Sequence, residues 1–165
     1  MKQALSSIHA LAEALGQQLK TRAWSLVVAE SCTGGNLCAA ITDIPGSSVW
    51  FDRGFVTYSN HAKEMMLNVP RATLLTYGAV SEESAIAMAN GALLVSNANI
   101  SVAITGVAGP TGGSREKPVG TVWIACASEN QKTEAKHYLF AGNRQTIRKQ
   151  AVFSALHDLI NRCAS

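Results

Sequence analysis

Residues 24–35 read WSLVVAESCTGG, and this stretch decides how the whole sequence is interpreted. Its apolar first half has the length and composition of a buried strand. A carboxylate, a hydroxyl, a thiol, a second hydroxyl and two glycines follow in succession. The next residues, NLCAAITDI (36–44), favour a helix that Pro45 and Gly46 would end. A plain turn needs only one or two such polar residues, so the stretch indicates either a capped helix start or a nucleophile above an anion-binding loop.

Helical and strand patterns alternate along the rest of the chain. Apolar residues recur every three or four positions in residues 2–21, in 81–97 and from Asn143 onward, which predicts amphipathic helices. The last two predicted strands can pair as a hairpin across ENQK (129–132). This order predicts an α/β protein, a three-layer α/β/α domain around a mixed β-sheet, with residues 1–165 forming one domain. The other predicted elements are strands at 51–60, 100–106, 119–128 and 134–141 and a short helix at 61–67.

The composition argues against several classes of protein. Of the 165 residues, 47% are hydrophobic and 15% are charged, which is typical of a compact globular chain. The net charge of +3 comes from scattered lysines and arginines, so no basic stripe points to nucleic acid. No apolar run is long enough to span a membrane, and the N-terminus lacks the apolar core of a signal peptide. We therefore expect a cytoplasmic protein that binds neither nucleic acid nor membranes.

The cysteines and histidines give no sign of a metal centre. The four cysteines form no CxxC pair, and the four histidines form no HExxH pattern. In a reducing compartment a disulfide framework is not expected either. We therefore predict no metal site and no cofactor.

Ser31 and Thr33 are the first candidates for chemistry. They directly follow a strand, and open α/β sheets bind ligands at the carboxyl ends of their strands. Gly34 and Gly35 would let backbone N–H groups approach a substrate, beside a helix start that favours negative charge. The alternative is that one hydroxyl simply caps the next helix. Cys32 competes as a nucleophile, but no histidine is adjacent to it, and a buried inert thiol fits it better.

Tyr58 and Lys63, in TYSNHAK (57–63), are the second candidates. A serine hydroxyl needs a base, and a lysine can serve if desolvation leaves its amine neutral. A tyrosine hydroxyl between them could relay a proton to a leaving nitrogen. The alternative is that Lys63 is one solvated lysine among several and that Tyr58 is a strand residue whose ring packs on the protein while its hydroxyl faces water.

Two further segments are suited to ligand binding. The stretch TGVAGPTGGSREKPVGTVW (105–123) matches neither GxGxxG nor the P-loop pattern, but its five glycines predict a backbone-lined ligand loop. In AGNRQTIRKQ (141–150), Asn143 is a good helix cap, and Arg144 and Arg148 lie one turn apart on the same face. Two cations at a helix start oppose its dipole, which makes sense if they hold a phosphate or carboxylate. A solvated basic face is the alternative.

Five segments in the same order resemble the CinA C-terminal domain family: AESCTGG (29–35), GFVTYSNHAK (54–63), YGAVSEE (77–83), the glycine-rich stretch 105–123 and AGNR (141–144). The resemblance runs from about Leu26 to Leu159. The family includes stand-alone nicotinamide-nucleotide amidases and the C-terminal half of competence/damage-inducible CinA proteins. The resemblance therefore implies a small nucleotide as substrate. It implies hydrolysis of nicotinamide mononucleotide to nicotinate mononucleotide and ammonia, as a step in pyridine-nucleotide recycling.

The resemblance also implies roles for individual residues. Ser31 matches the family's nucleophile, Lys63 its general base and Tyr58 the residue that assists proton transfer. Glu30 would orient this group. The predicted substrate-binding residues, including those that the local pattern alone indicated, are Glu30, Thr33, Gly34, Gly35, Thr105, Gly106, Arg144 and Arg148.

Two residues depart from the family's pattern. Thr111 follows Gly-Pro where an acidic residue is expected, and Arg115 stands where an acid is also common. A second hypothesis is therefore a catalytically weak or inactive paralogue that acts as a nucleotide-binding or regulatory protein. A third is a partner module in a competence or damage response. The sequence leaves the oligomeric state open, a homo-oligomer included.

Overall fold

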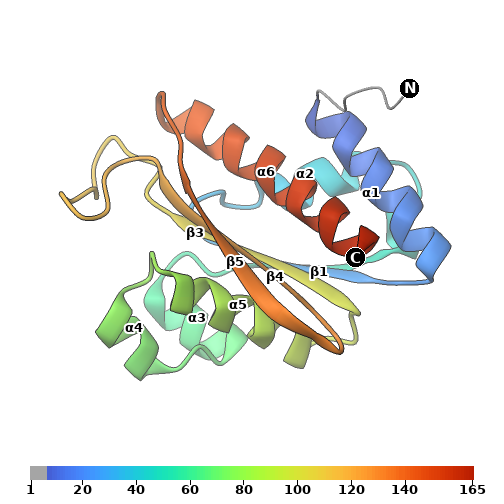
Figure 1. Cartoon of the computed structure of the whole chain (residues 1–165), viewed down its shortest axis with the longest axis horizontal. Helices are drawn as coiled ribbons and strands as arrows, with labels where there is room; N and C mark the ends of the chain where they lie inside the picture. The colour runs from blue at the N-terminus through green and yellow to red at the C-terminus, as the bar shows by residue number, and fades with distance from the viewer. Residues whose placement is uncertain (1–6) are drawn as a thin grey trace.

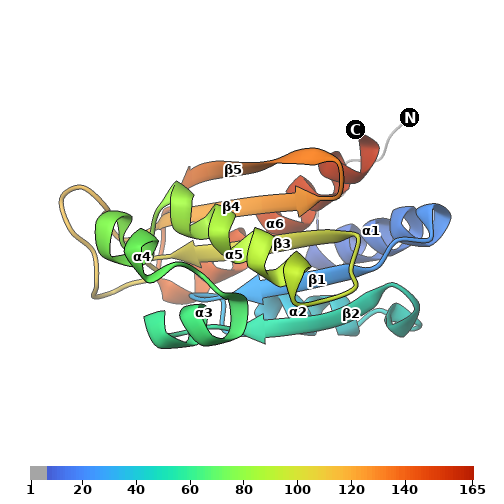
Figure 2. The same ribbon diagram turned by 90° about the horizontal axis from the view of Figure 1, so that it is seen from below.

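The computed structural model describes residues 7–165. Five strands form one mixed sheet in the order β2-β1-β3-β4-β5, with helices on both of its faces (Figures 1 and 2). The strands are β1 (Leu26–Glu30), β2 (Phe51–Val56), β3 (Ile100–Gly106), β4 (Thr121–Ser128) and β5 (Gln131–Leu139). The helices are α1 (Ile8–Arg22), α2 (Asn36–Thr42), the short 3-10 helix η1 (Ser47–Val49), α3 (Asn60–Leu67), α4 (Arg71–Tyr77), α5 (Glu82–Leu94) and α6 (Arg144–Ala164).

The pairing of the strands brings three strand ends to one edge of the sheet. Strand β1 lies between β2 and β3 and runs parallel to both, whereas β4 is antiparallel to β3 and β5 is antiparallel to β4. The carboxyl ends of β1, β2 and β3 therefore meet, and the residues that follow them share one region. This is the predicted three-layer α/β/α arrangement around a mixed sheet.

Each face of the sheet has its own apolar core. Helices α1, α2 and α6 cover one face and α3, α4 and α5 cover the other (Figure 1). The first core contains large side chains such as Leu15, Trp50 and Leu156, whereas the second is rich in alanines from α5, β3 and β4. Small side chains let α5 lie close to the sheet. The loss of water contact by both sets of side chains drives the assembly of the three layers.

The start of each long helix agrees with its sequence signal. The hydroxyls of Ser7 and Ser81 accept hydrogen bonds from the third residue of α1 and of α5, and Asn143 caps α6 in the same way. The predicted helix 2–21 is confirmed from Ile8 onward, and residues 2–6 lie outside the described part of the chain. The end of α3 packs closely against α5 at Gly91. A Cβ at this position would lie 1.9 Å from the Leu67 carbonyl oxygen, so only glycine allows the two helices to come this close.

Several local features differ from the expectation. The strand predicted at 51–60 ends at Val56, so Tyr58 lies in the loop that follows it. Helix α4 was not predicted, although Pro70 before it and Gly78 after it are ordinary helix boundary signals. The hairpin turn is also shorter than ENQK, because Ser128 pairs directly with Gln131. Asn130 has a φ of 63°, a left-handed conformation that asparagine tolerates better than most residues, so two residues suffice for the turn.

Candidate active site

Ser31 and Lys63 meet where β1 and β2 end. Ser31 is the first residue after β1, and Lys63 lies in the first turns of α3. A hydrogen bond of 3.1 Å joins the Lys63 Nζ to the Ser31 Oγ, and the same Nζ donates to the Thr57 carbonyl oxygen at 2.8 Å. Lys63 is only 1% exposed, so it is not the solvated lysine of the alternative interpretation. The arrangement places an amine within hydrogen-bond reach of a hydroxyl, which is the geometry that proton transfer between them would need.

The environment of Lys63 makes its ammonium easier to deprotonate than that of an exposed lysine. Burial lowers the pKa of Lys63 from its ordinary value, because an ammonium loses its hydration inside the protein. Across residues 7–165, no carboxylate forms an ion pair with it that would offset this effect. A lysine with a lowered pKa can accept a proton from a neighbouring hydroxyl.

Glu30, and neither Ser31 nor Thr33, caps the helix that follows the turn. Its carboxylate accepts three backbone N–H groups at the start of α2: Gly35 at 3.1 Å, Leu37 at 3.1 Å and Cys38 at 2.8 Å. Its side chain is fully buried. The capping interpretation of the two hydroxyls is therefore wrong. A carboxylate of the protein itself occupies the helix start that the sequence suggested for a substrate anion.

A pocket of about 270 Å³ opens above the Ser31–Lys63 pair. Of the predicted site residues, the structure brings Ser31, Tyr58, Lys63, Thr105, Gly106 and Arg144 to its walls. It does not bring Glu30, Thr33, Gly34, Gly35 and Arg148 there. Thr111, one of the two departures from the family's pattern, also lines the pocket, whereas Arg115 does not.

The two arginines of α6 have separate roles, although the sequence suggested a shared one. Arg144 donates from Nη1 to the Gly109 carbonyl at 2.8 Å and from Nη2 to the Tyr58 hydroxyl at 3.0 Å. Arg148 donates instead to the backbone carbonyls of Cys32 and Thr33, at 3.1 and 2.9 Å. Arg144 therefore forms part of the pocket wall, and Arg148 fastens the turn that carries Ser31.

Tyr58 lies at the mouth of the pocket rather than between the serine and the lysine. It is 61% exposed, and its hydroxyl bonds to Arg144. Within residues 7–165, no hydrogen bond joins this hydroxyl to Ser31 or to Lys63. Any part of Tyr58 in proton transfer therefore needs a substrate group or a water molecule to connect it to the pair.

The Cys32 thiol is not poised for reaction. Burial raises its pKa to about 11, which disfavours the nucleophilic thiolate. In the described part of the chain all four cysteines are free thiols, and no group of three or more histidine, cysteine or acidic residues could hold a metal ion. The same residues include no helix that is long and apolar enough to cross a bilayer.

Sequence reasoning missed several groups that shape the pocket. Asn60 lines it and stands inside the TYSNHAK segment, so its position two residues after Tyr58 was an available signal. The Thr57 carbonyl that holds Lys63 could not be found from residue type, because every residue carries such a carbonyl. Ala79 also lines the pocket and was missed; its carbonyl accepts from the Thr105 hydroxyl at 2.7 Å, which holds the segment before α5 against the pocket.

Comparison with known proteins identifies the family of the chain. The model of the CinA C-terminal domain matches residues 8–163. The chain belongs to this family. It is 50% identical over 154 residues to nicotinamide-nucleotide amidohydrolase PncC of Escherichia coli K12, with 93% of each chain covered. It is 49% identical over 146 residues to a CinA-like protein of Syntrophobacter fumaroxidans, of which it spans 34%.

Solved structures show the same fold. The crystal structure of a competence/damage inducible protein from Agrobacterium tumefaciens superposes with a TM-score of 0.94 at 43% identity, covering 100% of both chains. A competence damage-inducible protein from Klebsiella pneumoniae gives a TM-score of 0.93 at 40% identity, covering 96% of this chain and 98% of that one.

Proposed function

We propose that this family member is a nicotinamide-nucleotide amidohydrolase that converts nicotinamide mononucleotide to nicotinate mononucleotide and ammonia. The observation that carries the proposal is the 3.1 Å contact between the Lys63 Nζ and the Ser31 Oγ, in a pocket where the lysine has no acid partner among residues 7–165. Relatives that bear this enzyme's name over nearly the whole of both chains support the choice of substrate. We place the reaction in the cytoplasm, as a step of pyridine-nucleotide recycling.

In the proposed mechanism a neutral Lys63 removes the proton of Ser31. The Ser31 Oγ attacks the carboxamide carbon and forms a tetrahedral intermediate. The lysine then returns the proton to the leaving nitrogen, so that ammonia departs and an acyl-serine remains. Water, deprotonated by the same amine, hydrolyses the ester to the carboxylate and restores the Ser31 hydroxyl.

A backbone group next to Ser31 is suited to stabilise the negative oxygen of the intermediate. Within the described chain, the Cys32 N–H makes no hydrogen bond, and Cys32 lines the pocket. The N–H of the residue after the nucleophile has this role in other serine hydrolases. One such donor typically contributes about 3 kcal/mol to transition-state stabilisation. We assign this donor role to the N–H of Cys32, not to its thiol.

Arg144 is suited to hold the phosphate of the substrate. It uses one N–H toward Gly109 and one toward Tyr58, so three of the five N–H groups of a guanidinium stay available to a ligand. Arginine suits phosphate because its planar fork can form two parallel charge-assisted hydrogen bonds. Arg148 donates to two backbone carbonyls instead, so we assign phosphate binding to Arg144 alone.

The proposal is tested by measuring ammonia and nicotinate mononucleotide released from nicotinamide mononucleotide. Ser31→Ala should abolish release, by about 10⁴-fold or more, because the nucleophile is lost. Ser48→Ala is the matched control, since Ser48 is an exposed serine far from the pocket walls. Unchanged turnover in Ser31→Ala would reject the mechanism. Tight binding of the mononucleotide by the wild-type protein without turnover between about pH 6 and pH 10 would favour the regulatory paralogue instead.

A further inference from the structure

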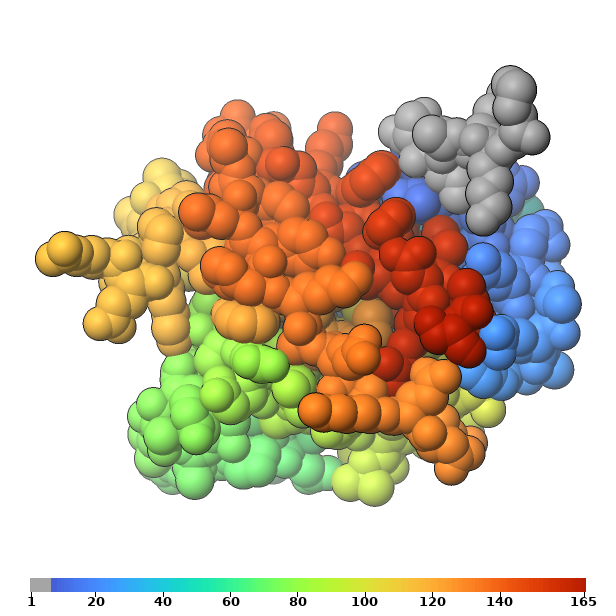
Figure 3. Space-filling model, viewed as in Figure 1, coloured from blue at the N-terminus to red at the C-terminus, as the bar shows by residue number. Residues whose placement is uncertain are grey.

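A second pocket lies on the other side of the molecule, between β5 and the C-terminal half of α6. Its volume is about 360 Å³, against about 270 Å³ for the candidate active site, and the two pockets share no residue. In the space-filling view it opens between the orange surface of β5 and the red surface of α6 (Figure 3). Ile124 and Cys126 of β4 give it an apolar floor.

Charged side chains lie on the face of β5 that is turned toward α6, where apolar side chains would normally be buried. Glu134 pairs in register with Cys126, and Lys136 pairs with Ile124, so both acid and amine point toward α6. Asp158 of α6 is buried, and it accepts from the Lys136 ammonium at 2.6 Å and from the Tyr138 hydroxyl at 2.8 Å. This carboxylate is therefore satisfied within the protein and is not available to a ligand.

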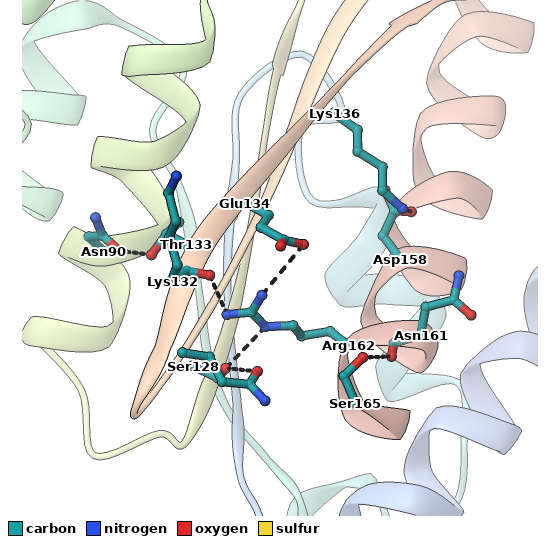
Figure 4. Close-up of polar contacts among 11 residues, drawn as sticks. Asn90, Ser128, Lys132, Thr133, Glu134, Lys136, Asp158, Asn161, Arg162 and Ser165 are labelled. Atoms are coloured by element: carbon teal, nitrogen blue, oxygen red, sulfur yellow. Dashed lines mark hydrogen bonds and ion pairs between the residues drawn. The ribbon is translucent and has the colours of Figure 1, made fainter.

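Unlike Asp158, Arg162 is not fully satisfied within the protein, because one nitrogen of its guanidinium has no hydrogen-bond partner in residues 7–165 (Figure 4). Its side chain is only 9% exposed, with Nε donating to the Ser128 hydroxyl at 3.1 Å and Nη2 to the Lys132 carbonyl at 2.6 Å. Nη1 has only the Glu134 carboxylate, at 3.7 Å, which is beyond a hydrogen bond. The Glu134 side chain is 71% exposed, so little holds it in place. A buried cation with unsatisfied N–H groups beside a pocket is suited to bind an anion.

We propose that this pocket binds a small carboxylate with a flat apolar body. The ligand's carboxylate displaces Glu134 and bonds to Nη1 of Arg162, and its body lies on Ile124 and Cys126. The charge of the pocket favours an anion, since the lining has three cations, Lys132, Lys136 and Arg162, against two acids. The volume lies in the range of small-molecule sites. The proposal does not depend on the amidase reaction, because it uses no residue of the candidate active site.

The test is an NMR titration of the full chain with benzoate and, as a neutral molecule of the same shape, benzamide. Benzoate should shift the Arg162 Nε–H resonance and the backbone amides of residues 131–136, and benzamide should leave them in place. Glu134→Gln should tighten benzoate binding about fivefold, because it removes the competing carboxylate. Glu129→Gln removes an exposed acid outside the pocket, and it should leave the affinity unchanged.

Three results would overturn the proposal: no benzoate shift at these resonances, equal shifts with benzamide, or no tightening in Glu134→Gln. The alternative role for these charges is to keep the edge strand β5 from pairing with other chains. If that is their only role, Glu134→Gln changes thermal stability or aggregation while benzoate still fails to bind. Benzoate shifts that persist in Arg144→Met support a site separate from the active site, and their loss in that variant contradicts it.

Discussion

Lys63 in the candidate active site and Lys136 in the second pocket have opposite electrostatic settings. Lys63 is buried against the Ser31 hydroxyl and the Thr57 carbonyl, and its pKa is lowered by burial. The side chain of Lys136 is half exposed, and its hydrogen bond with Asp158 raises its pKa. Each lysine connects a helix with the sheet or its edge: Lys63 of α3 contacts Ser31 after β1, and Lys136 of β5 contacts Asp158 of α6. The difference comes from the counter-charge, since a buried carboxylate faces one amine and no carboxylate in residues 7–165 pairs with the other.

The comparison shows how a structural lysine is distinguished from a reactive one. A lysine paired with a buried acid stays protonated and joins two elements, here β5 and α6. A lysine that is buried without an acid loses hydration without a compensating ion pair, which lowers its pKa toward the range of a general base. That unfavourable setting is a reason to expect function at Lys63 and structure at Lys136.

Among the variants that compare the two pockets, the largest effect is expected from Lys63→Met. Loss of the base should lower kcat for ammonia release about 10³-fold. The free energy of unfolding at pH 7 should stay the same or rise, because the variant removes a buried amine that has no acid partner. Lys136→Met makes the same chemical change in the other pocket and should leave kcat within about twofold of wild type. Equal loss of activity in both variants would remove the distinction between the two lysines.

Arg144→Met should have the next largest effect. Removal of a charge-assisted contact to the phosphate should raise KM for the mononucleotide about 10- to 100-fold. Arg148→Met is the control from the same helix face, because Arg148 holds the backbone of the turn rather than the pocket wall. It should lower thermal stability and change KM much less than Arg144→Met does. A larger KM effect in Arg148→Met would support the sequence-based prediction that Arg144 and Arg148 bind the phosphate together.

The pH dependence of activity should report Lys63 rather than Lys136. Because the pKa of Lys63 is lowered from 10.5, kcat/KM should rise by up to about tenfold per pH unit and level off below pH 10.5. Between the folded pKa and 10.5 the unfolded chain binds more protons at this residue, so its contribution to the free energy of unfolding rises with pH. Lys136→Met should leave the rate profile in place. A profile that moves with Lys136→Met would contradict the assignment.

The smallest effect is expected on stability, from Lys136→Met. The variant leaves Asp158 without its ammonium partner, which should lower the free energy of unfolding by about 1 kcal/mol, since water screens the half-exposed amine. Because its folded pKa is raised, the contribution of Lys136 is fully present below pH 10.5 and is lost as the pH rises through that folded value. Denaturant unfolding of both proteins at neutral and at strongly alkaline pH measures it. A stability difference that grows with pH would have the wrong sign.

Much of the fold could be predicted from residue patterns, because the strands and helices that build it have clear periodicity. The position of Ser31 at a strand end followed from the strand-turn-helix pattern. The burial of Lys63 did not, since a lysine is normally at the surface, and only the family resemblance pointed to it. Its contact with Ser31 depends on β1 and β2 being parallel neighbours, which local sequence does not state.

Other parts of the site were beyond sequence reasoning for physical reasons. Arg144 and Arg148 share a helix face, but the segments packed against each differ, and these come from distant parts of the chain. The capping role of Glu30 needed the direction of its side chain, because the usual cap is the residue just before the helix. The Lys136–Asp158 pair joins residues 22 positions apart, with no local pattern that connects them.

The carboxylate of Glu30 has a consequence for how the reaction begins. Its three bonds to the start of α2 tie the residue before Ser31 to the helix that follows, and the bonds of Arg148 to Cys32 and Thr33 hold the turn between them. The proposed nucleophile is thus preorganised, and the binding energy of a substrate need not be spent on ordering it. Substrate recognition can then be altered at Arg144 and the glycine-rich loop while the reacting groups keep their alignment.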